Sequence, residues 1–237
     1  MIVRRTPQTF ENRMTRTQII LGWLYLLVHV FVLPELLALY GQFSSDELSD
    51  ATANLLYYGV GIVFCLTVMF SFLRGGFDGM LDNLRLCIGS LLLGFLMDYA
   101  LSGAAALVLM LAEDAFANPN QEGIVEAAMS DGGGAVKATT IFLVPIVEEV
   151  LFRGVVFGSV RTRSRGWAFV VSAVLFALYH IWRYAVADPG MLIYAVQYLP
   201  VSIVLAWIYE RSGTIWPGVF FHMGINAMSF YVMDLIL

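Results

Sequence analysis

Two adjacent glutamates and an arginine lie within six residues of one another in an apolar stretch of this chain. Glu148, Glu149 and Arg153 belong to the run 138–160, which is otherwise suited to crossing a bilayer. An ionisable side chain in the middle of a membrane costs roughly 2.5–3.5 kcal/mol on insertion scales. Three of them in one apolar run therefore need partners or a chemical task.

Helix geometry separates the two glutamates. Glu149 and Arg153 are four residues apart on one face, with the acid on the N-terminal side, which is the favourable order for an ion pair. Glu148 is rotated by about 100° and cannot share that pairing well. We therefore expect the ion pair to be structural and Glu148 to be left over. A carboxylate in a low-dielectric place beside another negative charge is a stronger base, which suits Glu148 to general base catalysis.

Polar side chains recur at helical spacing in later apolar stretches. Phe176 and His180 are four residues apart, and His222 and Asn226 repeat that spacing. Counted at ~1.5 Å per residue from the cytoplasmic ends of their helices, the depths are about 18, 20, 15 and 21 Å for Glu149, His180, His222 and Asn226. Unrelated core histidines would have no reason to agree in depth. We expect these side chains to meet near the middle of the membrane.

The composition is that of an integral membrane protein. The chain has 237 residues, of which 59% are hydrophobic and 13% charged, and its mean hydropathy is +0.79. We predict an all-α, polytopic membrane helix bundle with about seven transmembrane helices in one membrane domain, residues 1–237. The predicted spans are 18–40, 53–73, 84–112, 138–160, 167–184, 191–209 and 216–237. Residues 138–237 carry the candidate chemistry, and residues 1–137 have no assigned role.

Arginines are distributed unevenly among the loops between these spans. If the N-terminus is cytoplasmic, ten arginines lie inside, whereas only Lys137 and Arg183 lie outside. The two acidic loops, 46–50 and 113–131, then both lie outside. We therefore expect a multi-pass protein of the cell membrane, with its N-terminus in the cytoplasm and its C-terminus outside.

Charge and cysteine content indicate which binding partners and metal sites the protein is expected to have. The net charge of −5 comes mostly from the acidic loops, and no basic stripe suits nucleic acid. Cys65 and Cys87 fall in different predicted spans, so a disulfide framework is not expected and a metal cluster lacks sulfur ligands. The lipid bilayer is the partner that these features predict, and nucleic acid is not.

Glycines and two further polar residues predict local features. Glycines at 75, 76 and 79 predict an interfacial turn after the second span. The run 132–134 predicts a flexible linker, with a movable lid over the site as the alternative. His29 and Asp98 lie at a similar depth, about 20 Å, and could pair across the first and third spans. We interpret that pair as structural and leave it out of the site.

The ordered motifs resemble a known family. E-E-x-x-x-R at 148–153, F-x-x-x-H at 176–180 and H-x-x-x-N at 222–226 follow one another on successive apolar segments, and the run 209–217 leads into the last. In this order they resemble the CAAX prenyl protease and bacteriocin-processing (CPBP, Abi) family of intramembrane endopeptidases, over about residues 140–230. The resemblance implies that a peptide bond of a membrane-associated protein or peptide is hydrolysed without a cofactor.

The resemblance also implies a role for each residue. Glu148 is the base, and His180 positions the attacking water. His222 and Asn226 donate hydrogen bonds to the oxyanion of the tetrahedral intermediate. These residue types suit the reaction, because an amide needs a base for water and preorganised donors for the developing negative charge.

Three alternatives use the same residues. A zinc-dependent peptidase could take Glu148, His180 and His222 as ligands, although the chain has no H-E-x-x-H helix. The buried acids and histidines could instead form a proton pathway in a carrier. A bacteriocin-immunity or scaffold protein would bind a partner without turnover, and it would keep its function after replacement of the glutamate.

Overall fold

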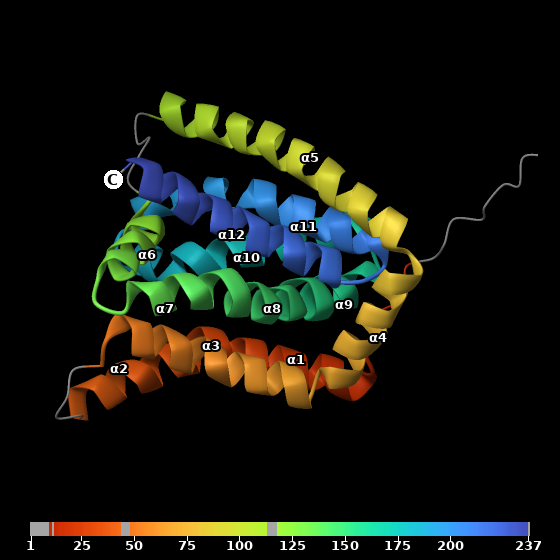
Figure 1. Ribbon diagram of the computed structural model, residues 1–237, viewed down its shortest axis with the longest axis horizontal. Helices are drawn as coiled ribbons and strands as arrows, with labels where there is room; N and C mark the ends of the chain where they lie inside the picture. Colours follow the sequence, from red (N-terminus) through yellow and green to blue (C-terminus); the bar gives the residue numbers. More distant parts are fainter. Residues whose placement is uncertain (1–9, 11, 44–47, 113–117, 237) are drawn as a thin grey trace, which may run out of the picture.

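The computed structural model describes residues 10, 12–43, 48–112 and 118–236, and every regular element in these ranges is a helix (Figure 1). The predicted all-α membrane helix bundle is confirmed. The α-helices are α1 (Arg16–Leu27), α2 (Leu33–Phe43), α3 (Asp50–Thr67), α4 (Phe70–Asp82), α5 (Leu84–Leu111), α6 (Pro119–Met129), α7 (Gly133–Ala138), α8 (Val144–Glu148), α9 (Gly158–Arg161), α10 (Arg165–Ala187), α11 (Leu199–Ser212) and α12 (Trp216–Ile236). Three π-helical segments, η1 (Val28–Val32), η2 (Thr139–Leu143) and η3 (Glu149–Phe157), and the 3₁₀ helix η4 (Pro189–Gln197) complete the set.

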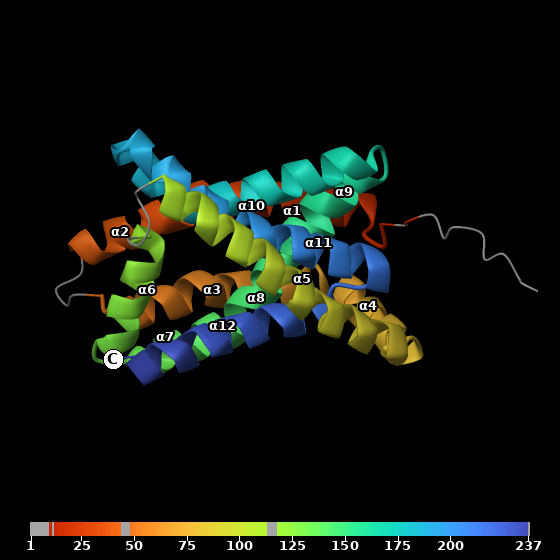
Figure 2. The same cartoon turned by 90° about the horizontal axis from the view of Figure 1, so that it is seen from above.

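One unbroken helix runs through the centre of the bundle. It consists of α7, η2, α8, η3 and α9 and covers residues 133–161. The helices α1 and α3 pack on one side of it, and α10, α11 and α12 pack on the other (Figure 1). Seen from above, α11 lies between α10 and α12 (Figure 2). The helix α5 lies outside α11 and α12. The charged run 148–153 is therefore enclosed by both halves of the chain.

Three helices in the described ranges are long and apolar enough to cross a membrane. They are Arg16–Phe43, Leu84–Leu111 and Arg165–Ala187. The number rises to five if each of two bent helix pairs counts as one span. The chain is thus a multi-pass membrane protein, and the total of seven spans stays a prediction.

The two bent pairs correct the predicted bounds of two spans. The second span, predicted at 53–73, is interrupted because α3 ends at Thr67 and α4 departs at 76° to it. The turn predicted at glycines 75, 76 and 79 is wrong, because α4 continues through them. The sixth span, predicted at 191–209, begins as the 3₁₀ helix η4 and bends by 45° into α11. Pro200 lies in the first turn of α11, where a missing N–H is tolerated.

The linker predicted at 132–134 is a tight turn instead. Gly132 has a φ of 88°, in the left-handed region that favours glycine, and α7 begins at the next residue. A Cβ on Gly133 would lie 2.1 Å from the carbonyl oxygen of Ala128 in α6. The helix α6 is therefore folded directly back against the start of the central helix, and the linker interpretation is wrong. The lid alternative stays a hypothesis.

The middle of the central helix is π-helical. In a π-helix the backbone N–H bonds five residues back, so a turn holds more residues than an α-helical turn. All nine residues of η3 are buried, including Glu149 and Arg153. Its apolar side chains belong to the largest core cluster: Val150, Leu151, Phe152, Val155, Val156 and Phe157. Because helices pack on both sides of η3, its charged side chains face protein and not lipid.

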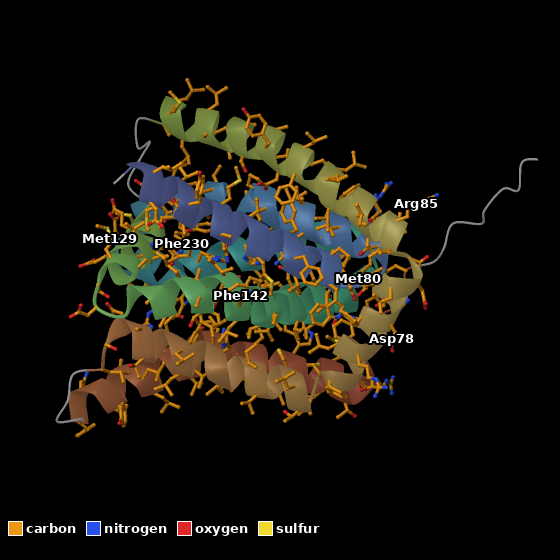
Figure 3. The ribbon with its side chains drawn as sticks, in the orientation of Figure 1. Asp78, Met80, Arg85, Met129, Phe142 and Phe230 are labelled. Carbon is orange, nitrogen blue, oxygen red and sulfur yellow. The ribbon has the colours of Figure 1, made fainter. Side chains whose placement is uncertain are left out.

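Charged side chains pair at the two ends of the bundle. At one end Arg161 and Arg165 pair with Glu210, and at the other Lys137 pairs with Asp234 and Arg183 with Glu35. Figure 3 shows two further charged residues, Asp78 and Arg85, at the end of the bundle opposite Met129. The orientation of these ends across the membrane stays a prediction.

Glycines bring the N-terminal helices close to the central helix. A Cβ on Gly22 of α1 would lie 2.4 Å from Val155, and one on Gly61 of α3 would lie 2.7 Å from Val147. Small residues permit such close backbone approach between membrane helices. The approach at Gly61 holds the preceding turn of α3, which carries Tyr58, beside the central helix.

We expect Gly61→Leu to lower the melting temperature of the protein, because overpacking a close contact costs about 1–3 kcal/mol. Gly59→Leu is the matched control, since a Cβ at Gly59 on the same helix meets nothing within 4 Å. Thermal unfolding of both variants in one detergent makes the measurement. Equal melting temperatures for the two variants would contradict the packing of α3 on α8.

Candidate active site

The predicted ion pair forms inside the central helix. Arg153 Nη1 lies 3.1 Å from Glu149 Oε1, and both side chains are 0% exposed. The Nη2 atom of Arg153 donates to the carbonyl oxygen and the hydroxyl of Ser202 on α11, at 3.3 and 3.2 Å. The guanidinium also lies over the Phe176 ring of α10, 4.3 Å from its centroid. The pair is thus held by two neighbouring helices as well as by its own.

Glu149 has a second partner on α12. His222 Nδ1 donates to Glu149 Oε1 over 3.1 Å, because a carboxylate can only accept. The Nε2 atom of the same ring lies 3.9 Å from Glu148 Oε2. His222 therefore lies between the two adjacent glutamates, a contact that the sequence pattern did not predict.

Glu148 differs from its neighbour in what it faces. Its Oε1 accepts a hydrogen bond from the Tyr58 hydroxyl over 3.2 Å, and its Oε2 has no hydrogen-bond partner within the described ranges. Glu149 also has one oxygen, Oε2, without a hydrogen-bond partner among the described residues. Of the two glutamates, however, only Glu148 lines the cavity described below. The division between a structural and a remaining glutamate, expected from helix geometry, agrees with these contacts.

His180 is held in one tautomer by its own helix. Its Nδ1 lies 2.8 Å from the Phe176 carbonyl oxygen and must donate to it. In the neutral ring, Nε2 then carries the lone pair and can accept a hydrogen bond. The ring stacks on Tyr198, with centroids 4.3 Å apart and planes at 20°. Its orientation is therefore fixed from two sides.

Asn226 lies one turn after His222 on α12. Its Nδ2 donates to the Thr140 carbonyl oxygen of the central helix over 2.8 Å. The side-chain amide has two N–H donors, so one stays available to a further acceptor. The hydrogen bond to Thr140 orients the amide with respect to the helix that carries Glu148.

The four candidate catalytic side chains line one cavity of about 880 Å³. Glu148 comes from the central helix, His180 from α10, and His222 and Asn226 from α12. Apolar residues of α5, α6 and α12 form much of the remaining wall, among them Ala105, Leu109, Ile124, Val125, Ile225 and Phe230. The structure thus brings three of the side chains in the depth count, His180, His222 and Asn226, to one cavity, where Glu148 joins them in place of its neighbour Glu149. Their catalytic roles stay proposals.

Two tyrosines in the cavity wall were missed from the sequence. The hydroxyls of Tyr58 on α3 and Tyr179 on α10 lie 3.1 Å apart, and Tyr58 bonds Glu148 directly. Both residues line the cavity. A usable signal was present, since the adjacent pair Tyr57 and Tyr58 places two hydroxyls within an apolar span, where each needs a partner.

The pairing predicted between His29 and Asp98 is wrong. The His29 ring nitrogens contact the hydroxyls of Tyr25 and Tyr179, at 3.4 and 3.3 Å. Asp98 lines the cavity instead, and its Oδ1 has no hydrogen-bond partner in the described part of the chain. Depth along a helix axis does not determine the direction in which a side chain points, and the two residues face different neighbours.

The zinc alternative depends on a set of ligands that could converge. Among the described residues, no three His, Cys, Asp or Glu side chains are grouped so as to hold a metal ion. Glu148 and His222 approach one another, whereas His180 contacts Phe176 and Tyr198. Metal independence stays a prediction with a direct test.

Residues 135–228 match the sequence model of a family described as Type II CAAX prenyl endopeptidase Rce1-like. The segment runs from the central helix into α12 and contains every candidate site residue. The resemblance stated from the ordered motifs is thereby confirmed over these residues. Fold and segment together define the class: a multi-pass helical membrane protein with a segment similar to type II CAAX prenyl endopeptidases.

Two curated relatives align with 84 residues, 35% of this chain. The UPF0177 protein YxdF of Lactococcus lactis subsp. lactis (strain IL1403) is 33% identical over 42% of its own length. The protein named "Putative membrane peptidase YdiL" of Bacillus subtilis (strain 168) is 30% identical over 31% of its length. The chain thus matches less than half the length of these relatives. No solved structure matches it.

We expect Glu149→Gln to lower the stability of the protein, because it leaves Arg153 buried without its counter-charge, a cost of about 3–5 kcal/mol. The double variant Glu149→Gln with Arg153→Met should recover part of the loss, since it removes the unpaired charge. Melting temperatures in detergent make the comparison. A double variant less stable than Glu149→Gln alone would contradict the role assigned to the pair.

Proposed function

We propose that the protein is an intramembrane endopeptidase that hydrolyses a peptide bond in a membrane-associated protein or peptide. One observation carries the proposal. Glu148, His180, His222 and Asn226 converge from three helices on one cavity, within the segment similar to type II CAAX prenyl endopeptidases. The set combines a carboxylate base, a lone-pair acceptor and side-chain donors, which are the groups that amide hydrolysis requires.

The first step is activation of a water molecule. Glu148 Oε2 takes a proton from the water, while His180 Nε2 accepts a hydrogen bond from its second O–H and fixes its orientation. The resulting hydroxide attacks the carbonyl carbon of the scissile amide. The electron pair of the C=O π bond moves to the oxygen, which becomes the oxyanion.

The second step is collapse of the tetrahedral intermediate. The free N–H of Asn226 stabilises the oxyanion, and so does His222 if its Nε2 carries a proton. That requires the imidazolium form, since Nδ1 already donates to Glu149. The proton on Glu148 passes to the leaving nitrogen as the C–N bond breaks, which restores the carboxylate.

The apolar wall of the cavity indicates the kind of substrate. Side chains such as Leu109 and Ile124 offer no partner to a polar peptide side chain, whereas they suit a segment already partitioned into the bilayer. The proposal therefore names a membrane-associated peptide or protein as the substrate, without assigning it a lipid modification.

We expect Glu148→Gln to abolish peptide hydrolysis while the protein stays folded, because the amide keeps the size of the side chain but cannot act as a base. His180→Ala should reduce turnover at least about 100-fold, since both residues act on the same water. Glu126→Gln, on the exposed face of α6, is the matched control for removing a carboxylate. The assay measures cleavage of a membrane-inserted reporter peptide, together with the melting temperature of each variant.

Full turnover by Glu148→Gln would exclude the mechanism. A cellular function that survives Glu148→Gln unchanged would favour the scaffold or immunity alternative. Proton flux into liposomes that depends on Glu148, with no cleavage of any peptide, would favour the carrier.

Peptide hydrolysis should also withstand removal of transition metals, because water activation is assigned to Glu148 and His180 and the oxyanion to donor side chains. The measurement is the cleavage rate before and after treatment with EDTA and 1,10-phenanthroline, with elemental analysis of the purified protein. One tightly bound zinc per chain, with activity lost on its removal and restored by its return, would establish the zinc-dependent alternative.

A further inference from the structure

A chain of four hydrogen-bonded ring side chains, a buried histidine and three half-buried tyrosines, connects the N-terminal helices to the candidate catalytic base. The Tyr58 hydroxyl lies 3.2 Å from Glu148 Oε1 and 3.1 Å from the Tyr179 hydroxyl. The Tyr179 hydroxyl lies 3.3 Å from His29 Nε2, and His29 Nδ1 lies 3.4 Å from the Tyr25 hydroxyl. Four hydrogen bonds therefore lead from α1 through η1, α10 and α3 to Glu148.

Counting protons gives every bond of this chain the same direction. Ionised Glu148 only accepts, so Tyr58 uses its single hydroxyl proton on Glu148 and must accept from Tyr179. Tyr179 has then used its own proton and must accept from His29, which places the imidazole proton on Nε2. The lone pair on Nδ1 of the neutral ring accepts from Tyr25. All four protons point toward the carboxylate.

Tyr57 lies in the same cluster but outside this chain. Its ring stacks on the His29 ring with centroids 4.2 Å apart. Its hydroxyl donates to the His29 backbone carbonyl over 2.8 Å. The hydroxyl also lies 3.3 Å from that of Tyr179, but both protons are already used, so this contact carries no donated hydrogen. Tyr57 supports the backbone at His29, whereas Tyr58 and Tyr179 contact the base or its donor.

The burial of His29 indicates that the hydrogen-bonded chain does more than fill space between the helices. His29 is 0% exposed in the middle of an apolar helix, where an imidazole is costly unless both nitrogens are satisfied. Its two ring partners are the hydroxyls of the chain. Hydrogen bonds arranged in series polarise one another, so donors that all point one way strengthen the last bond, which ends on the negative charge.

We propose that Tyr58, Tyr179 and His29 form a positioning chain that holds the Glu148 carboxylate for water activation. The chain occupies Oε1 and leaves Oε2, the oxygen without a hydrogen-bond partner among the described residues, for the water. This inference rests on the proposed function, because it assigns positioning residues to the same reaction. Tyr58 and His29 lie outside the matched segment 135–228, so the N-terminal helices contribute directly to the site.

The test compares tyrosine-to-phenylalanine variants, which remove one hydroxyl and keep the ring. Tyr58→Phe and Tyr179→Phe should each lower kcat about 10–100-fold, as expected for residues that orient a catalytic ligand, with KM changed less than about twofold. The double variant should lose no more than about twofold beyond Tyr58→Phe, because one chain is broken only once. Tyr57→Phe should lose clearly less kcat than Tyr179→Phe.

Tyr209→Phe is the control for removing a buried hydroxyl. Tyr209 is 2% exposed and packs on Phe10 and Phe157 instead of the chain, so its kcat and KM should match the wild type. Melting temperatures of all variants identify any loss of folded protein. Equal kcat losses for Tyr57→Phe and Tyr58→Phe, or losses that multiply in the double variant, would overturn the positioning chain.

An infrared measurement separates this inference from the proposed function. Subtracting the spectrum of Glu148→Gln from that of the wild type isolates the Glu148 carboxylate stretch. Tyr58→Phe and Tyr179→Phe should shift this band, whereas Tyr209→Phe should not. An unshifted band would overturn the proposal of a positioning chain even if Glu148 proves essential for hydrolysis. A shifted band in a protein that cleaves no peptide would keep the chain and reject the endopeptidase.

Discussion

Glu149 and Arg153 form a fully buried ion pair, one turn apart, in a helix that α1, α3, α10, α11 and α12 all contact. A buried pair repays its desolvation only when further hydrogen bonds satisfy both partners. Ser202 on α11 and His222 on α12 supply hydrogen bonds, and the Phe176 ring of α10 lies against the guanidinium, while Arg153 Nε and Glu149 Oε2 have no hydrogen-bond partner among the described residues. The pair thus requires α10, α11 and α12 to surround the central helix, and the same arrangement delivers His180, His222 and Asn226 to the cavity beside Glu148.

Adjacent glutamates in one helix can have separate roles only if their surroundings differ. Glu149 is turned toward the guanidinium and the imidazole, which bring positive charge or N–H donors. Glu148 is turned toward the cavity and receives a single hydroxyl donor from the N-terminal half. The π-helical segment η3 begins at Glu149, directly after Glu148, and all nine of its residues are buried. Two neighbouring positions on one helix are therefore assigned different roles: Glu149 stabilises the helix bundle, and Glu148 faces the cavity.

Much of the candidate site could be predicted from the sequence, because helical spacing and depth are linear in residue number. The four-residue spacing predicted the Glu149 and Arg153 contact, and the ordered motifs predicted the side chains that share the cavity. The Tyr58 contact to Glu148 could not be predicted, because it depends on which face of α3 meets the central helix. The same limitation made the pairing of His29 with Asp98 wrong. The bend after Thr67 was missed because the apolar composition continues through it.

The partners of the central helix also have an order in time. Ribosomal synthesis releases Glu149 and Arg153 before Phe176, Ser202 and His222 exist, so the run 148–153 reaches the translocon without the residues that will surround it. A helix that carries these charges inserts into lipid poorly by itself. The charges of the central helix therefore reach their full set of partners only after the last three helices have been translated. A chain truncated before α12 would lack the imidazole that donates to Glu149, so the order of synthesis and the order in which the buried charges are satisfied are linked.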